Sequence, residues 1–306
     1  MTQNITGGIE AALAVARDAE VVVLMLGIDG SLEGESNDRT SIDLPAIQHE
    51  LAAAVLALGK PTVIVLINGG VVGIAQEKES APAILEAWYP GFWGARAIAD
   101  TLFGDNHNLG GKLPVTWYDK NYVNEVKMSN MDFRPQAGVS PGRTYRYFTG
   151  QPTYPAFTGI SLTTFEVSAA VEQQQAMDRS LFIQTGDLQA HASRTLKVTN
   201  NGSRTGDEVI FMFVSEHNST SGLIRRLADF QRVHLAPGQS ANVTFDITAE
   251  LLKITELSTG NIVSRPGEFT VSFSTGGEQA LFSQHVEVKA KGPNQIPVVL
   301  EKFPLY

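Results

Sequence analysis

The chain has 306 residues, about twice the length of a typical single domain, so we expect two domains. It is 43% hydrophobic and 18% charged, with 28 glycines and 14 prolines, which excludes a wholly disordered or collagen-like chain. The formal net charge is −9, and no basic run is longer than Arg225-Arg226. These features argue against a nucleic-acid partner, because binding the phosphate backbone requires clustered lysine and arginine.

Neither a membrane span nor a disulfide framework is indicated. The longest apolar stretches, 21–26 and 61–67, are far shorter than the roughly twenty residues that cross a bilayer. The chain has no cysteine, which removes disulfides, thiolate metal ligands and a cysteine nucleophile. Residues 1–20 lack the basic start and apolar core of a signal peptide.

The first half of the chain alternates helical and strand patterns. Ile9, Ala12, Leu13 and Ala16 recur at helical spacing, and the apolar run 21–26 that follows predicts a strand buried on both faces. The same unit recurs, with expected helices at 47–58 and 95–102 and expected strands at 62–67, 83–88 and 112–116. This alternation predicts a mostly parallel α/β sheet with helices on both faces.

From about Thr163 the apolar period changes from helical to alternating. Half-buried strands are expected at 195–199, 209–214, 243–247 and 269–273, with a last strand ending near Val288. Asn200-Asn201-Gly202 and Ala236-Pro237-Gly238 are turn signals between these strands. The pattern predicts an antiparallel β-sandwich of the immunoglobulin or fibronectin type.

The fold class expected from these patterns is therefore α/β plus all-β. We place the α/β sandwich at residues 1–158, the β-sandwich at 159–291 and a C-terminal tail at 292–306.

The loop that follows the first strand is the first candidate site, because ligands of α/β sheets bind beyond the carboxyl ends of strands. The stretch 27–39 contains four carboxylates, Asp29, Glu33, Glu35 and Asp38, and one positive charge, Arg39. It is either an ordinary solvated loop or the position of a general acid/base whose pKa its surroundings raise. Asp38-Arg39 is interpreted as structural, an ion pair or a cap that fixes the loop.

Other motifs give weaker signals. Asn68-Gly-Gly70-Val-Val-Gly73 lacks the first glycine of the dinucleotide fingerprint. Gly138-Val-Ser140-Pro-Gly142 matches a hydrolase nucleophile pattern, but Pro141 has no N–H for an oxyanion hole. The six histidines show no metal-ligand spacing, so we expect neither a metal nor a cofactor.

The acidic loop resembles the acid/base loop of glycoside hydrolase family 3, especially its β-xylosidase branch, in the pattern Gly27-Ile-Asp-x-Ser-x-Glu33-x-Glu35-x-x-Asp38-Arg39 with Leu44-Pro45. Further stretches resemble that branch in the same order: Lys60-Pro-Thr-Val, Trp88-Tyr-Pro-Gly91, Gly104, Gly111-Lys-Leu-Pro-Val-Thr116, Met128-x-x-Met131 with Arg134, and Pro141-Gly-Arg-Thr-Tyr-Arg-Tyr147. Phe230-Gln-Arg-Val233 with Leu235 and Pro237-Gly238 is similar to the fibronectin-like domain of these enzymes.

The resemblance implies hydrolysis of terminal β-linked sugars from xylan-type oligosaccharides by the retaining, double-displacement route. Glu35 matches the family's acid/base position, three residues before Asp38-Arg39. Glu33 is the fallback acid/base, or a neighbour that raises the pKa of Glu35 by like-charge repulsion.

The family's nucleophile is an aspartate in a Ser-Asp-Trp-like motif on a preceding (β/α)8 barrel, and this chain has neither the motif nor the barrel. The junction with the second domain also departs from the family's Phe-Gly-Tyr-Gly-Leu-Ser, since it reads Ala156-Phe-Thr-Gly159-Ile-Ser161. The chain therefore resembles the C-terminal part of such an enzyme, and we expect it to be inactive without the barrel.

A second hypothesis is a non-catalytic carbohydrate-binding or interaction protein that keeps the scaffold. An exposed apolar patch on the α/β face where the barrel should dock would favour the C-terminal part of an enzyme, because monomers rarely leave such surfaces bare. A polar face there would favour the second hypothesis. The resemblance implies an extracellular or cell-wall location, and it leaves xyloside, glucoside and arabinoside substrates open.

Overall fold

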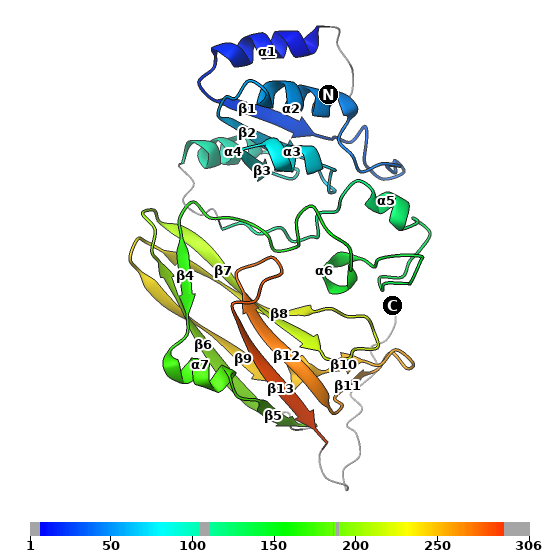
Figure 1. Ribbon diagram of the computed structural model, residues 1–306, viewed down its shortest axis with the longest axis vertical. Coiled ribbons are helices and arrows are strands. Elements are labelled where there is room, and N and C mark those ends of the chain that lie inside the picture. The colour runs from blue at the N-terminus through cyan, green and yellow to red at the C-terminus, as the bar shows by residue number, and fades with distance from the viewer. Residues whose placement is uncertain (1–6, 105–109, 186, 188–189, 291–306) are drawn as a thin grey trace. The chain divides into compact units, whose positions relative to one another are not determined.

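The computed structural model describes residues 7–104, 110–185, 187 and 190–290 (Figure 1). They form two compact units. The first contains the described residues of Met1–Asn106, Trp117–Met131 and Gly150–Tyr154, and the second those of His107–Thr116, Asp132–Thr149 and Pro155–Tyr306. The chain thus passes between the units several times. The sequence suggested a single boundary between the two domains, after residue 158. The expected tail at 292–306 lies outside the described residues.

The first unit is an α/β structure around a parallel sheet of order β1-β2-β3 (Figure 1). Helix α1 packs against α2, and α2 against α3. Its elements are α1 (Gly8–Asp18), β1 (Val22–Gly27), α2 (Ala46–Leu56), β2 (Thr62–Ile67), α3 (Ala75–Ser80), β3 (Ala83–Glu86), α4 (Gly94–Phe103) and α5 (Tyr122–Glu125). Because the three strands are parallel, the loops that follow them leave the sheet at the same end.

The expectation of strands buried on both faces is confirmed for β2 and wrong for β1. In β2, Ile64, Val65 and Leu66 are at most 1% exposed. In β1, Leu24 and Leu26 are buried, but Val23 and Met25 are 43% and 47% exposed. Val23 and Met25 alternate with Leu24 and Leu26, so one face of β1 is packed and the other is open to solvent among the described residues.

Two other expected strands differ from the structure. The strand expected at 83–88 stops at Glu86, because Trp88 adopts a left-handed φ of 52° that a strand cannot contain. The strand expected at 112–116 is not a strand. Leu113 exchanges backbone hydrogen bonds with Phe157 and Thr158, but Pro114 has no N–H with which to continue a ladder.

The second unit is a β-sandwich of a five-stranded sheet, β5-β13-β12-β7-β8, and a three-stranded sheet, β4-β6-β9 (Figure 1). Pairing is antiparallel except between β5 and β13. The two-stranded ribbon β10–β11 is separate. The elements are α6 (Thr144–Tyr147), β4 (Phe165–Ser168), α7 (Val171–Met177), β5 (Leu181–Gln184), β6 (His191–Asn200), β7 (Gly206–Glu216), β8 (Arg226–Leu235), β9 (Ser240–Thr248), the 3-10 turn η1 (Glu250–Leu252), β10 (Ile254–Thr255), β11 (Ile262–Val263), β12 (Gly267–Ser274) and β13 (Phe282–Lys289).

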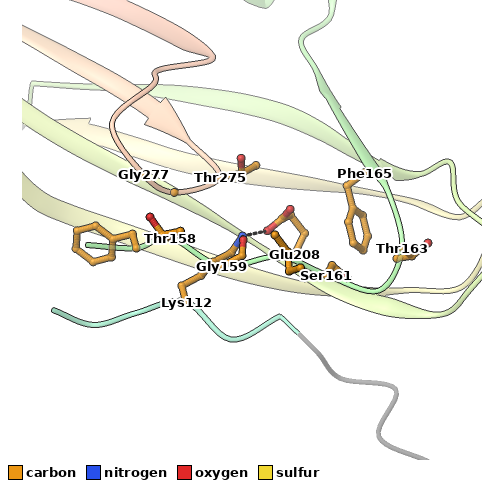
Figure 2. Close-up of a pocket in the computed structure, with 12 residues that line it drawn as sticks. Lys112, Thr158, Gly159, Ser161, Thr163, Phe165, Glu208, Thr275 and Gly277 are labelled. Atoms are coloured by element: carbon orange, nitrogen blue, oxygen red, sulfur yellow. Dashed lines mark hydrogen bonds and ion pairs between the residues drawn. The ribbon is translucent and has the colours of Figure 1, made fainter. Parts of the chain in front are cut away.

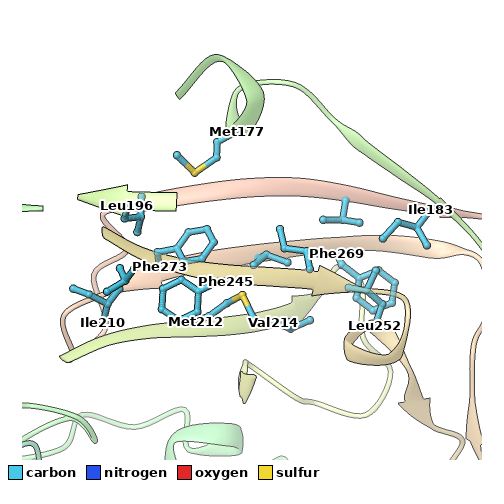
Figure 3. Close-up of a cluster of buried hydrophobic side chains, with 14 of the residues drawn as sticks. Met177, Ile183, Leu196, Ile210, Met212, Val214, Phe245, Leu252, Phe269 and Phe273 are labelled. Atoms are coloured by element: carbon cyan, nitrogen blue, oxygen red, sulfur yellow. The ribbon is translucent and has the colours of Figure 1, made fainter. Parts of the chain in front are cut away.

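The core of this unit is formed by alternate residues of both sheets. Figure 3 shows Phe245 of β9 facing Phe273 of β12, with ring centroids 5.5 Å apart. The four alternating stretches expected from the sequence all lie inside strands of this sandwich, in β6, β7, β9 and β12. Their inward residues are almost fully buried, since the hydrophobic effect favours removing alternate apolar side chains from water. The expectation of a half-buried strand is wrong for β7, because Val209, Phe211 and Phe213 on its other face are also buried, in a cluster with Ala156 and Phe157.

Asn200 fixes the turn that leads from β6 to β7. Asn200 is 0% exposed, and both the oxygen and the nitrogen of its side-chain amide form hydrogen bonds. Oδ1 accepts from the Gly202 amide at 3.0 Å and the Thr163 hydroxyl at 2.9 Å, while Nδ2 donates to the carbonyls of Arg204 at 2.7 Å and Leu235 at 2.8 Å. The amide therefore ties the turn to the end of β8.

We expect Asn200→Asp to lower the free energy of unfolding by about 3 kcal/mol, because a buried carboxyl would face two carbonyl oxygens that have lost their donor. Chemical denaturation measures this change. The neighbouring, exposed Asn201→Asp is the matched control and should stay within about 0.5 kcal/mol of the parent chain. Equal losses in the two variants would contradict the role given to the buried amide.

Candidate active site

The acidic loop begins at Gly27, the last residue of β1. Gly27 has a φ of 140°, and a Cβ there would lie 1.9 Å from the Ile67 carbonyl oxygen, so only glycine fits. The Gln48 side chain accepts from the Gly27 amide and donates to its carbonyl, both at 2.8 Å. Gln48 is 5% exposed, so helix α2 holds the start of the loop through a buried amide.

Glu33 holds the middle of the loop against the two neighbouring loops. Its carboxylate accepts from the amides of Gly69 at 2.6 Å and Gly70 at 3.2 Å, and from the Tyr89 hydroxyl at 2.7 Å. Arg39 Nη2 lies 3.1 Å from Glu33 Oε2. The loops after β1, β2 and β3 are thus joined at one carboxylate.

These contacts keep Glu33 ionised. Desolvation acts to raise the pKa of the Glu33 carboxyl, but the hydrogen bonds from Tyr89, Gly69 and Gly70 and the charge of Arg39 outweigh it and hold that pKa below 4.5. Burial, together with the Glu33 carboxylate, raises the pKa of the Tyr89 hydroxyl to about 12, so that hydroxyl stays a donor. A carboxyl in this state is a poor general acid near neutral pH.

The two glycines of the second loop are required by this close approach. A Cβ at Gly69 would lie 2.7 Å from Tyr89 Cε2 and 2.8 Å from Glu33 Oε1, and one at Gly70 would lie 2.6 Å from Arg39 Nη2. The Asn68–Gly73 stretch, which the sequence compared with a dinucleotide loop, therefore binds the Glu33 carboxylate within the protein. This is the same physical device, backbone N–H groups that face an anion.

Arg39 pairs with Glu33 in place of its expected neighbour Asp38. Besides that pair, Arg39 Nη1 donates to the Val71 carbonyl at 3.2 Å. Asp38 is exposed, and no hydrogen bond or ion pair joins it to another described residue. Helix α2 begins after Pro45 without a side-chain cap, so Asp38 does not cap it.

Glu35 occupies the corner of a tight turn at the tip of the loop. Gly34 and Asn37 exchange two backbone hydrogen bonds, of 3.3 and 3.0 Å, and Glu35 and Ser36 are the central residues. Ser36 has a φ of 63°, as the second central residue of a type II turn requires. The Asn37 side chain donates to the Ser31 carbonyl at 2.9 Å and closes the loop behind the turn.

The Glu35 side chain is exposed, and no described residue forms a hydrogen bond or an ion pair with it. The loop thus contains two glutamates, two positions apart, in opposite situations. The Glu33 carboxylate is bound by four groups of the protein, whereas the Glu35 carboxylate is exposed to solvent.

The end of the loop is held by a charged network. His49 of α2 lies between Asp43, at 3.1 Å, and Glu77 of α3, at 2.7 Å. Glu77 is 2% exposed, so this network is anchored in the interior. Next to it, the Gly73 amide donates to the Ile42 carbonyl at 2.7 Å, which ties the end of the acidic loop to the loop after β2. Both ends of the loop are therefore fixed to helix α2, by Gln48 at one end and by His49 at the other.

Glu86, at the end of β3, is a buried carboxyl that the sequence did not single out as a site residue. It accepts from the Trp88 amide at 2.7 Å through Oε1, Oε2 is shielded from solvent, and the Asn68 side chain also acts on the carboxyl as a hydrogen-bond donor. Burial raises the pKa of Glu86 from 4.5 to about 7. Tyr89 lies in the Trp88–Gly91 stretch that resembles the family, but nothing local shows that its hydroxyl binds Glu33, which is 56 residues away. The burial of Glu86 has no local sequence signal either.

A pocket of about 390 Å³ in the second unit is a separate feature (Figure 2). Lys112 and Glu208 point toward each other at its base, 2.9 Å apart, and Lys112 also donates to the Gly159 carbonyl at 3.0 Å. No carboxylate of the acidic loop lines it. The charges at its base are paired internally, so the pocket does not offer a free acid or base.

The serine of the Gly138–Gly142 motif is not a nucleophile in the structure. Ser140 is 6% exposed, and its hydroxyl accepts from the Gly142 amide at 3.1 Å within a tight turn. The hydroxyl stabilises the turn, in agreement with the objection raised by Pro141.

Two family models match the chain. Residues 3–162 match the glycosyl hydrolase family 3 C-terminal domain, and residues 208–276 match a fibronectin type III-like domain. Among curated relatives, the exo-1,4-beta-xylosidase bxlB of Emericella nidulans is 35% identical and covers 98% of this chain. The periplasmic beta-glucosidase of Salmonella typhimurium is also 35% identical and covers 86%.

Solved structures of glycosidases are also similar to this chain. A GH3 exo-beta-xylosidase (XlnD), in complex with a xylobiose aziridine probe, has a TM-score of 0.85 at 27% identity over 99% of this chain. A beta-glucosidase from Kluyveromyces marxianus, in complex with glucose, has a TM-score of 0.76 at 28% identity over 94%. The chain spans only 34% to 40% of the length of these four proteins.

No helix in the described ranges combines the length and the apolar character that crossing a bilayer requires.

Glu86 makes the stability of the first unit depend on pH. Because its folded pKa of about 7 lies above 4.5, the folded state binds the proton more tightly. That contribution is complete below about pH 4.5 and is lost as the pH rises through 7. We expect the free energy of unfolding to fall by about 3 kcal/mol across this window, and Glu86→Gln to remove this contribution.

Denaturation at a series of pH values tests this. The exposed Glu79→Gln is the matched control and should keep the slope of the parent chain. Glu33 does not interfere, because its lowered pKa makes stability change only below about pH 4.5. An unchanged slope in Glu86→Gln would contradict the assignment.

Proposed function

Because the chain belongs to glycoside hydrolase family 3, we propose that it is the C-terminal part of an exo-acting, retaining β-glycosidase of the β-xylosidase type. In this proposal it supplies the general acid/base to a site whose nucleophile lies on a (β/α)8 barrel. The substrates are terminal β-linked sugars of xylan-type oligosaccharides. The relatives named β-xylosidase and β-glucosidase support the reaction class.

The observation that carries the proposal is the contrast between Glu33 and Glu35. A group that gives and takes a proton at the substrate must be able to reach it, and its oxygens cannot all be occupied by the protein. Glu35 meets both conditions, whereas Glu33 is held by two backbone amides, a tyrosine and an arginine. We therefore assign Glu35 as the acid/base and Glu33, with Arg39, as the anchor that positions it.

In the proposed mechanism, the barrel carboxylate attacks the anomeric carbon while Glu35 protonates the leaving oxygen. Glu35, now ionised, then takes a proton from the water that releases the sugar from the glycosyl-enzyme. A general acid at neutral pH needs desolvation or a neighbouring carboxylate. For Glu35, which is exposed, that environment has to come from the barrel and the bound substrate.

The exposed apolar side chains of the first unit support a covering partner over the non-catalytic alternative. Phe92, Trp93 and Phe103 are 90%, 74% and 83% exposed, in addition to Val23 and Met25 of β1. Exposed apolar side chains mark interaction sites where they gather, and Phe92 and Trp93 do gather, with ring centroids 5.2 Å apart. We also propose an extracellular or cell-wall location, which the relative named periplasmic supports.

We expect the purified chain alone to release no more product from an aryl β-xyloside than buffer does, because one of the two carboxylates is absent. Release of nitrophenol, followed by absorbance, measures this. Turnover that disappears in Glu35→Gln would contradict the need for a barrel, while turnover that persists in that variant would indicate a contaminant.

The role of Glu35 can be tested in a chimera in which this chain replaces the matching part of the Emericella nidulans relative. We expect Glu35→Gln to lower kcat/KM by about 10²–10⁴-fold for substrates with poor leaving groups and much less for activated aryl glycosides, which need no protonation. Glu33→Gln should lower activity equally for all leaving groups, because it disturbs position. The exposed Glu50→Gln is the control. The opposite pattern for Glu33 and Glu35 would exchange their roles.

A further inference from the structure

Three chemistry-bearing side chains that are distant in the sequence meet on the five-stranded sheet of the second unit. His217 directly follows β7, Glu268 is in β12 and His285 is in β13. These strands are neighbours in the order β13-β12-β7 (Figure 1). The three residues are 51 and 17 positions apart, which is why no ligand spacing was visible in the sequence.

Strand register explains why the side chains converge. The His217 amide donates to the Glu268 carbonyl at 2.8 Å, so these residues lie opposite each other. His285 lies opposite Thr270, which is two residues after Glu268 and therefore on the same face of β12. Phe269 and Val271, which alternate with them, point into the core. The cluster is on the solvent face of the sheet.

The ligand atoms are close together. One nitrogen of each histidine and one oxygen of Glu268 all lie within 4.8 Å of one another. His217 Nδ1 is 3.6 Å from Glu268 Oε2, and the two imidazole rings have centroids 5.6 Å apart. Ligands of a tetrahedral zinc ion are about 3.4 Å apart, since Zn–N bonds are about 2.0–2.1 Å, so small side-chain rotations bring the set to that spacing.

Each histidine also has a hydroxyl group that orients its other nitrogen. His217 Nε2 lies 2.7 Å from the Thr270 hydroxyl, and His285 Nδ1 lies 3.1 Å from the Ser180 hydroxyl. When these nitrogens donate to the hydroxyl oxygens, the remaining nitrogen of each ring carries a lone pair. Metal-binding histidines are typically held in this way by a second group.

The His49 cluster of the first unit provides a contrast. There, both ring nitrogens are already engaged by carboxylates, those of Asp43 and Glu77. No ring nitrogen remains for a metal, and the histidine acts as an internal link. The cluster on the sandwich is different because its rings keep one nitrogen available.

We propose that His217, Glu268 and His285 form a binding site for a divalent metal ion of the zinc class. Two imidazoles and one carboxylate, with water in the fourth position, suit Zn²⁺ and its neighbours Co²⁺, Ni²⁺ and Cu²⁺. Ca²⁺ and Mg²⁺ are disfavoured, because they require six or more oxygen ligands. The bound ion links β12 and β13 with the residue that follows β7, across the face of the sheet, so it stabilises the fold of the second unit.

The test uses the untagged full chain after treatment with a chelator. Titration with ZnCl₂ in a calorimeter should give one site per chain, and Zn²⁺ should raise the Tm by several degrees, whereas Ca²⁺ should not. Co²⁺ should give the visible absorption of tetrahedral coordination. His217→Ala, His285→Ala and Glu268→Gln should each weaken Zn²⁺ binding at least about tenfold.

All three positions are partly or fully exposed, so these variants should fold, and their Tm without metal checks this. His191→Ala is the matched control, because it removes an exposed histidine of the other sheet, at the start of β6, and should leave binding unchanged. The proposal is overturned if the parent chain binds no Zn²⁺ up to roughly 1 mM, far above the range of structural sites. It is also overturned if the three variants bind as well as the parent, or if His191→Ala weakens binding equally.

Discussion

The arrangement of the candidate site depends on one carboxylate, that of Glu33. A flexible loop of polar residues has no conformation of its own, because the entropy of ordering must be offset by specific contacts. Glu33 provides them by binding the amides of Gly69 and Gly70 and the Tyr89 hydroxyl, while Arg39 neutralises its charge. Because these partners come from the loops after β2 and β3, one group brings three loops together.

This constraint explains the residues around it. Gly69 and Gly70 cannot carry a side chain, since a Cβ would meet Tyr89, Glu33 or Arg39. Gln48 and His49 fix the two ends of the same loop to helix α2. Ser36, in the loop after β1, and Trp88, in the loop after β3, have left-handed φ angles of 63° and 52°. Strained backbone of this kind is common at functional sites. What remains free after all these contacts is the corner of the turn, where Glu35 is exposed.

Patterns within short stretches of sequence predicted most of the fold. The continuous apolar run of β2 and the alternation in β6, β9 and β12 are local signals, because β2 is buried on both faces and the other three strands on one. Strand β8 was not predicted, since its sequence Arg-Leu-Ala-Asp-Phe-Gln-Arg-Val-His-Leu contains many polar residues and is only partly buried. The strand expected at 112–116 was wrong because a single apolar stretch with Pro114 cannot continue a ladder. The resemblance to a family selected Glu35. Apart from Arg39, the groups that bind Glu33 are 36 to 56 residues away in the chain, so no local pattern could reveal that it is an anchor.

The division of roles between the two glutamates can be measured most directly through the amide protons of Gly69 and Gly70, by hydrogen exchange and NMR on the isolated chain. We expect slow exchange of both amides in the parent chain, much faster exchange in Glu33→Ala, and no change in Glu35→Ala, because only Glu33 accepts hydrogen bonds from them. If Glu35→Ala frees these amides, or if Glu33→Ala leaves them protected, then Glu33 is not the anchor and the assignment of Glu35 to the chemistry loses its structural basis.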